Sequence, residues 1–294
     1  MIHQNLILPL QNGAPIVLQG GMTGTSADFS GLCRLLNLEE SPSSVSAESP
    51  EMELLLVDTL PVLSAEEYFL FRRNRIAAVY DRKNCSFRLY LGDDRIKETV
   101  PQLAKVWQHS IVYGVLAAML RGKAVTLVHC SLLETARGGL MICGESGMGK
   151  STTGRRIREA GGLCYADDLV LLEMTGPDSF TAYPLPTWSA CQTSLTDKVY
   201  PYDRGMRLGG VLALSRGVER EEIRTVLPTE YFAQLYRSVY YFHIYFVRML
   251  QREEQEKITA CVQKITTALT SAFPALGLFA NLSADIKTTL KEYL

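Results

Sequence analysis

The first third of the chain alternates between short apolar runs and one long apolar helix pattern. Apolar, β-branched and aromatic residues bounded by turn-forming residues predict three strands, at Glu53–Leu60, Arg75–Tyr80 and Ser86–Leu91. Residues 81–84 join the last two and are typical of a hairpin turn. Between Leu103 and Leu120 apolar residues recur at helical spacing, so we expect a largely buried helix there.

Glycine and polar residues interrupt this pattern near the N-terminus. Residues 1–40 hold apolar pieces separated by glycine-rich turns, and Gly20–Gly24 predicts a plain loop because it lacks the lysine of a phosphate loop. Ser41–Glu51 is a low-complexity polar stretch that predicts a mobile surface loop. We place a domain boundary near residue 100, which gives an N-terminal α+β domain over 1–100 and a second domain over 101–294.

The second part opens with two strands joined by a very short turn. Ala124–Leu133 and Gly139–Cys143 are β-like, and residues 134–138 form the turn between them. Because a parallel crossover needs a dozen or more residues, these two strands are expected to pair antiparallel. The usual P-loop NTPase begins instead with a parallel βαβ unit. The hairpin therefore distinguishes this chain from that class of enzymes.

Further strands and a helical C-terminal region follow. The apolar runs predict strands at Leu163–Glu173, Phe180–Leu185 and Leu208–Ser215. From Glu219 to Leu294 the pattern predicts an almost wholly helical region, broken at Pro228 and around Pro274.

Residues 144–151 carry the strongest chemical signal. They read Gly-Glu-Ser-Gly-Met-Gly-Lys-Ser and match the phosphate-loop pattern G-x-x-x-x-G-K-[ST]. Glycines let several backbone N–H groups point at one anion, Lys150 would contact the β- and γ-phosphates, and the Ser151 hydroxyl would ligate magnesium. A helix over Ser151–Ala160, ending at Gly161–Gly162, supplies the context that a bare glycine turn would lack. The nucleotide-binding residues that we predict are Gly144, Glu145, Ser146, Gly147, Met148, Gly149, Lys150, Ser151 and Thr152, with Glu145 and Met148 at variable positions of the motif.

An Asp-Asp pair follows this phosphate loop. Neighbouring residues of a strand point to opposite faces, so Asp167 and Asp168 would not aim at one atom unless the strand ends or bends there. A division of roles follows, with one carboxylate facing a phosphate acceptor and the other a metal or a basic partner. A pair of solvated strand-end carboxylates is the alternative.

Composition and charge exclude some classes of function. Hydrophobic residues make up 47% and charged residues 21% of the 294, and the net charge of −1 gives no reason to expect nucleic acid or an anionic membrane as partner. Seven cysteines without a C-x-x-C pair argue against a disulfide framework or a zinc site. Without a signal-peptide pattern or a long apolar segment, a cytoplasmic location fits best.

The ordered residues His129, Gly139, the phosphate loop and Ala166-Asp167-Asp168 resemble the kinase domain of HPr serine kinase/phosphorylase, over about residues 120–175. This resemblance implies an α/β fold with a mixed-sheet P-loop kinase core like that of phosphoenolpyruvate carboxykinase. The residue pattern adds a smaller N-terminal α+β domain and a helical C-terminal region. The resemblance also implies ATP- and magnesium-dependent phosphorylation of a serine on a small protein.

The same resemblance implies roles for individual residues. Asp167 would be the base on the acceptor hydroxyl, Asp168 would join Ser151 in holding magnesium, and His129 would lie near the transferred phosphate. Lys150 completes the catalytic set. Taken alone, a histidine in this strand would more often be a satisfied core residue.

The chain also departs from that family. Thr152 stands where the family has Glu, and Tyr183–Ser189 replaces a later signature that is tied to dephosphorylation. The chain is closer in style to the HPr-kinase-like proteins of peptide-modification cassettes, such as the SynChlorMet cassette kinase homologue. We therefore expect a kinase that phosphorylates a peptide or small protein. Two alternatives stay open: an ATPase or small-metabolite kinase, and a nucleotide-binding accessory or sensor protein without turnover.

Other residues carry weaker signals. Trp188 and Ser189 would line an acceptor groove or form a rigid turn, and Arg204 and Arg207 would clamp a phosphate or lie solvated on the surface. A helix over Tyr231–Leu250 has aromatic residues at nearly every turn, which favours core packing or a subunit interface, so a homo-oligomer is open.

Overall fold

The computed structural model divides the chain into two compact units. The first consists of Met1–Lys123, Pro186–Val199 and Tyr245–Ile258, and the second of Ala124–Leu185, Tyr200–Ile244 and Thr259–Leu294. The structure describes residues 2–12, 14–22, 50–57, 62–73, 76–92, 100–185, 204–216, 219–281 and 284–291. The expected boundary near residue 100 stays a prediction, and the helix that follows it belongs to the first unit.

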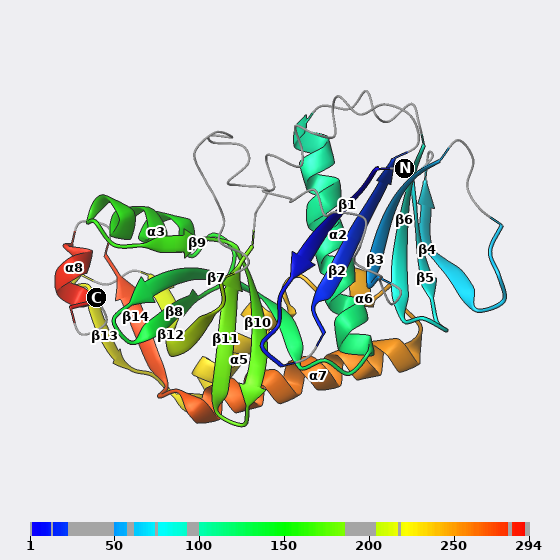
Figure 1. Cartoon of the computed structure of the whole chain (residues 1–294). Coiled ribbons are helices and arrows are strands. Elements are labelled where there is room, and N and C mark those ends of the chain that lie inside the picture. Colours follow the sequence, from blue (N-terminus) through cyan, green and yellow to red (C-terminus); the bar gives the residue numbers. More distant parts are fainter. Residues whose placement is uncertain are drawn as a thin grey trace. The chain divides into compact units, whose positions relative to one another are not determined.

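A six-stranded mixed sheet with one long helix forms the first unit (Figure 1). Its elements are β1 (Ile2–Leu8), β2 (Ile16–Met22), β3 (Met52–Val57), β4 (Glu67–Arg73), β5 (Ile76–Asp81), β6 (Ser86–Gly92) and α2 (Val100–Leu120). The strand order is β1-β2-β3-β6-β5-β4, with parallel pairing at β2–β3 and β3–β6 and antiparallel pairing elsewhere. Helix α2 packs against β2, β3 and β6.

The alternation of side chains explains how α2 covers this sheet. Phe87 of β6 stacks on Tyr113 of α2 with ring centroids 5.0 Å apart, whereas the neighbouring Arg88 takes the opposite face. Residues 111–119 are all buried, as the helical pattern predicts. This packing of aromatic and aliphatic side chains is the core of the first unit.

Two expectations for the first unit need correction, and one strand was missed. Gly20 and Gly21 continue strand β2 instead of forming a loop, because β1 and β3 pair with β2 on both edges. Strand β4 was not expected from the pattern. Glu51 is buried and paired rather than mobile, while residues 41–49 of the predicted polar loop lie outside the described residues.

A second mixed sheet of eight strands forms the second unit. Its strands are β7 (Val125–Thr135), β8 (Gly138–Cys143), β9 (Cys164–Ala166), β10 (Leu169–Gly176), β11 (Ser179–Pro184), β12 (Met206–Arg216), β13 (Glu222–Thr225) and β14 (Leu276–Ala280). The main order is β11-β10-β7-β8-β12-β14-β13, with β9 on β7 and an additional pairing of β11 with β12. The predicted hairpin is confirmed, since β7 and β8 pair antiparallel from Cys130–Cys143 to Thr135–Gly138.

Strand β8 has a different kind of neighbour on each side. It is antiparallel to β7 but parallel to β12, which is in turn parallel to β14. Both sheets are therefore mixed, and the chain has a mixed α/β fold.

The C-terminal region is less helical than expected. Its helices are α5 (Pro228–Tyr240), α6 (Ile244–Val247), α7 (Arg252–Ala272) and α8 (Ile286–Thr289), and α3 (Lys150–Glu159) precedes them in the chain. The prediction of an almost wholly helical region is wrong, because β13 and β14 pair with each other and β14 pairs with β12. The single helix expected over Tyr231–Leu250 is also wrong, since α5 ends at Tyr240 and a turn precedes α6.

Aliphatic side chains fill the core of the second unit beneath β8, β12 and α3. The buried residues are Leu133, Leu140, Ile142, Ile157, Leu212, Leu214, Leu278, Ile286 and Leu290. This core supports the end of β8 and the start of α3, and so it positions the loop between them. None of the helices described is long and apolar enough to cross a bilayer.

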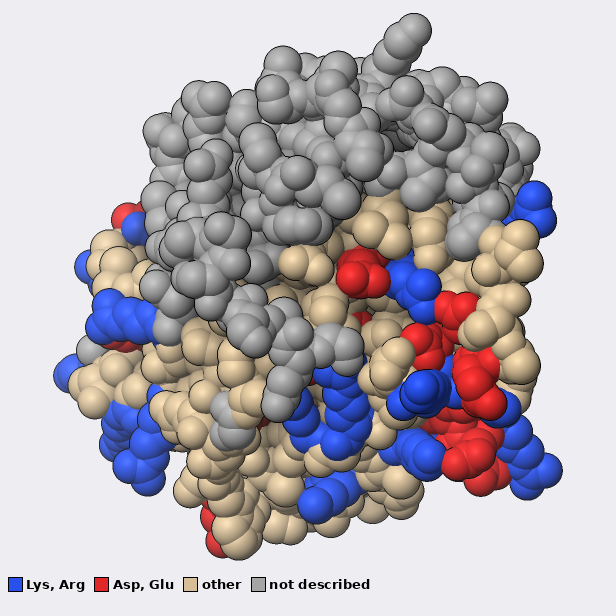
Figure 2. Space-filling model, turned by 45° about the vertical axis from the view of Figure 1, so that its right-hand side comes forward, with Lys and Arg blue, Asp and Glu red and all other residues tan. Residues whose placement is uncertain are grey.

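Charged side chains of opposite sign are neighbours on the surface. Helix α7 carries the ion pairs Arg252–Glu256 and Lys257–Glu253, each one turn apart. Figure 2 shows basic and acidic residues side by side over the lower right of the face that it displays.

Candidate functional site

The phosphate loop lies between the end of β8 and the start of α3. Strand β8 ends at Cys143, as predicted, and α3 begins at Lys150, one residue before the predicted start. Gly147 and Gly149 have φ angles of 81° and 105°, in the left-handed region that strains other residues. The N-cap of α3 is Gly149, which supplies no side-chain hydrogen bond, so this end of the helix is suited to an anion.

Helix α3 also ends as predicted. Gly161 has φ of 81° and donates to the Arg158 carbonyl, while Gly162 donates to the Ile157 carbonyl. These two bonds form a Schellman motif. The elements around the loop thus start and stop where local sequence signals place them.

Lys150 is buried inside the loop. Its Nζ donates to the carbonyl oxygens of Gly144 at 2.7 Å and Glu145 at 2.9 Å. Burial is the main effect on the Lys150 ammonium and lowers its pKa, whereas the neighbouring acidic groups act to raise that pKa. Among the described residues no carboxylate forms an ion pair with Lys150, so neutral acceptors hold this cation.

The paired aspartates occupy a break between two strands. The single strand expected over Leu163–Glu173 is wrong: β9 ends at Ala166 and β10 begins at Leu169. On one edge of β7, β10 pairs as far as His129 and β9 pairs from Leu132. The bend at residues 167–168 therefore lies beside the middle of β7, where the chain has room to turn the two carboxylates apart.

Asp167 and Asp168 have different partners. Asp168 Oδ1 lies 3.1 Å from His129 Nε2, and Asp167 Oδ2 lies 3.8 Å from Arg158 Nη2 of α3. The Ser151 hydroxyl donates to the backbone carbonyl of Asp167 at 3.5 Å, a long hydrogen bond that still joins the aspartates to the phosphate loop. The structure thus brings His129, Lys150, Ser151 and both aspartates into one region.

His129 is enclosed by aromatic rings. Its imidazole lies 4.2 Å from the Tyr241 ring and 5.6 Å from the Phe242 ring, measured between centroids. Nδ1 is buried and has no hydrogen-bond partner in the part of the chain described. Tyr241 is 39% exposed, so it covers the histidine from the solvent side.

Three side chains that the sequence reasoning missed contact the loop or the end of β8 before it. Arg216, at the end of β12, donates to the Gly147 and Met148 carbonyls. Gln234 donates to the Cys143 carbonyl at 3.2 Å, and Arg237 pairs with Glu145. No local motif marks these residues, because each contact joins segments far apart in the chain.

Other candidate residues lie elsewhere. Arg207 is at the opposite end of β12 from Arg216, and Arg204 Nη2 lies 3.7 Å from Glu134. Trp188 and Ser189 lie outside the described residues. Over the described ranges, no group of three or more His, Cys, Asp or Glu side chains is arranged to hold a metal ion.

Comparisons with known proteins give a family and, among the solved structures, weak similarities. No curated protein matches the chain. An HPr(Ser) kinase/phosphatase from Coxiella burnetii is similar to it with a TM-score of 0.28 and 11% identity, over 56% of this chain and 94% of that one. The model of the SynChlorMet cassette protein ScmC matches residues 94–292, about two thirds of the chain. The chain therefore belongs to the SynChlorMet cassette protein ScmC family.

Proposed function

We propose that this protein transfers the γ-phosphate of ATP to a hydroxyl group on a peptide or small protein. One observation carries the proposal: a glycine loop holds a cation on neutral carbonyls, beside two aspartates with separate partners. Phosphoryl transfer requires positioning, neutralisation of charge and a group that takes the acceptor proton. The residues around the loop can supply all three.

Residues 144–152 would bind the triphosphate. The first N–H groups of α3 and the glycine backbone suit the anionic oxygens, and Lys150 adds a positive charge that no described carboxylate neutralises. Burial makes that charge costly without a ligand, so phosphate binding would stabilise the ammonium.

Ser151 and Asp168 would hold the magnesium ion. Magnesium in nucleotide sites takes one or two protein oxygens together with phosphate oxygens, so a three-residue cluster is not required. When bound, the ion neutralises charge on the transferred phosphate. His129 Nε2 keeps the Asp168 carboxylate oriented at 3.1 Å.

Asp167 would take the proton from the acceptor hydroxyl. Its side chain is only 14% exposed, and Arg158 at 3.8 Å restrains the carboxylate. A carboxylate next to the metal but held by a different partner fits the division of roles between base and ligand. Residues 1–100 would recognise the acceptor or another partner.

The test uses ATP labelled on the γ-phosphate, magnesium, and a pool of synthetic peptides with one serine each. A second pool has alanine in place of that serine. We expect label in the serine pool only, and none with Lys150→Ala. Asp167→Asn should slow transfer with ATP affinity retained, whereas Asp168→Asn should be partly restored by more magnesium.

Other outcomes would select other functions. Transfer that survives both Lys150→Ala and Asp167→Asn would refute the assigned roles. Steady ATP hydrolysis that the peptides do not change would indicate an ATPase or a small-metabolite kinase. Tight ATP binding without turnover would indicate an accessory or sensor protein.

A further inference from the structure

Arg216 contacts the backbone of the phosphate loop instead of a side chain. Its Nε donates to the Met148 carbonyl at 2.7 Å, and its Nη2 donates to the Gly147 carbonyl. A Cβ added to Gly149 would lie 3.7 Å from Arg216 Nε. Among the described residues Arg216 forms no ion pair with a carboxylate, although its side chain is exposed.

These two bonds fix the orientation of the peptide units that they touch. In a planar trans peptide the C=O and the N–H of the next residue point in opposite directions. Holding the Met148 carbonyl therefore directs the Gly149 N–H to the side of the loop away from Arg216. The peptide unit between Gly147 and Met148 is held at both of its polar groups. Arg216 binds the Gly147 carbonyl, and the Met148 N–H donates to the Glu145 carbonyl at 3.1 Å.

We infer that Arg216 is a positioning residue for phosphate binding, which acts through the peptide units between Gly147 and Gly149. It presents the Gly149 N–H to the phosphates before they arrive and adds a second positive charge to the loop that no described carboxylate pairs with. This inference rests on the proposed function, because it concerns the same loop. Preorganised donors of this kind bind an anion without the cost of ordering the loop.

Arg237 provides a matched control. It is an exposed arginine that also contacts the loop, but it pairs with the side chain of Glu145 and not with the backbone. Removing Arg237 therefore takes away the same charge and leaves the peptide units in place. Lysine at position 216 keeps the charge and loses the planar fork that reaches two carbonyls.

The experiment measures binding of ATP and AMP by calorimetry, together with thermal unfolding, for the wild type and four variants. The variants are Arg216→Ala, Arg216→Lys, Arg237→Ala and Arg237→Lys. We expect Arg216→Ala to weaken ATP binding by roughly 10- to 100-fold, the range for hydrogen bonds to charged groups. Arg216→Lys should lose an intermediate amount, and the Arg237 variants about twofold. The loss should be larger for ATP than for AMP.

Several results would overturn the inference. Equal losses for Arg216→Ala and Arg237→Ala would show that only charge matters. A lower unfolding temperature with unchanged ATP affinity would show that Arg216 merely ties β12 to the loop. If Arg216→Ala does not fold, the comparison of Arg216→Lys with Arg237→Lys decides in the same way. A wild type that binds no ATP would instead refute the proposed function, and the inference would fall with it.

Discussion

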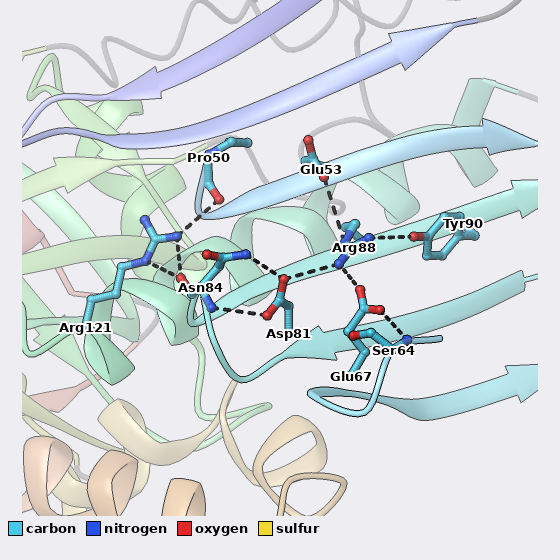
Figure 3. A network of polar contacts seen from close by, with 9 residues as sticks. All are labelled: Pro50, Glu53, Ser64, Glu67, Asp81, Asn84, Arg88, Tyr90 and Arg121. Carbon is cyan, nitrogen blue, oxygen red and sulfur yellow. Dashed lines mark hydrogen bonds and ion pairs between the residues drawn. The ribbon is translucent and has the colours of Figure 1, made fainter. Parts of the chain in front are cut away.

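Two cations, the half-buried Arg88 of the first unit and the buried Lys150 of the second, are held in opposite ways. In the first unit Arg88 lies between Glu53, Glu67 and Asp81, at 4.0 Å from Glu53 and 3.3 Å from Asp81 (Figure 3). In the second unit Lys150 is held by backbone carbonyls and, among the described residues, by no carboxylate.

Glu51, also in the first unit, is likewise surrounded by charges of opposite sign. Its carboxylate accepts from Arg121 at 2.9 Å, from Lys123 at 3.0 Å and from the Val17 N–H at 2.8 Å. Removing one partner of such a pair is destabilising, because the other charge is left unpaired, and the paired charges leave little field for a ligand. Cations held by neutral oxygens keep their charge available, so the phosphate loop is suited to bind an anion.

Replacing Lys150 should have the largest effect on ligand binding. Lys150→Met removes the buried charge while keeping a side chain of similar length. We expect ATP affinity to fall by more than about 100-fold, because a charge-assisted contact to phosphate is lost. The free energy of unfolding should stay the same or rise, since burial disfavours the ammonium in the absence of phosphate. Calorimetry and urea unfolding measure the two quantities, and ATP binding within a few-fold of wild type would contradict the comparison.

Replacing Arg88 should show the opposite behaviour. Arg88→Met leaves three carboxylates facing one another, and we expect a loss of about 2 kcal/mol in the free energy of unfolding, reduced from a fully buried case because the side chain is 24% exposed. ATP affinity should not change. Arg72→Met is the control, because Arg72 is an exposed arginine of the same sheet that lies over the Phe69 ring. An equal loss of unfolding free energy in Arg88→Met and Arg72→Met would show that the three carboxylates around Arg88 do not matter for stability.

Local signals in the sequence predict the loop and its flanking elements well. The glycines Gly149 and Gly161 adopt backbone conformations that a tight loop and a helix end require, and Lys150 supplies the charge of the phosphate-loop motif. No distant partner is needed to recognise them. Helix α2 was also predictable, because its apolar residues repeat at the helical period.

Elements whose identity depends on distant partners were not predictable. Residues 276–280 form an apolar run that suits a helix or a strand, and pairing with Ala213–Arg216 of β12 decides in favour of β14. Arg216 touches Met148 across 68 residues of chain, and nothing near it in the sequence marks that contact. The side chains around the loop therefore had to come from the structure.

Acid should act on the second unit before the first. Burial lowers the pKa of His243 from 6.5 to about 3, and its Nε2 lies 2.9 Å from Thr126 Oγ1. As pH falls below 6.5, His243 binds a proton in the unfolded chain but not in the folded chain. The free energy of unfolding should therefore fall by up to about 1.4 kcal/mol per pH unit. In the first unit, the Ser64 backbone N–H is the main cause that lowers the pKa of Glu67 below 4.5. Its contribution is present above pH 4.5 and is lost only as pH falls further.

Thermal unfolding between pH 7.5 and 5 checks this prediction. The double variant Thr126→Val/His243→Leu removes both partners of the buried hydrogen bond and should lose this part of the pH slope. The difference between the two proteins cancels the titration of the remaining histidines. An unchanged slope in the double variant would show that His243 is not its source.

Salt should produce the smallest difference between the cations bound to carbonyls and the cations paired with carboxylates. Arg216 is exposed and bound to carbonyls, so added NaCl should screen its attraction for phosphate and weaken ATP binding several-fold between 50 mM and 500 mM, as estimated from the Debye length. The Arg121–Glu51 and Lys123–Glu51 pairs are in contact at about 3 Å, well inside that length, so the stability of the first unit should change little. Calorimetry of ATP binding and hydrogen exchange of the first sheet, each measured across this salt range, check both halves. ATP affinity that does not respond to salt would mean that the loop cations are already neutralised, and the contrast between them and the carboxylate-paired cations would then be one of geometry and not of charge.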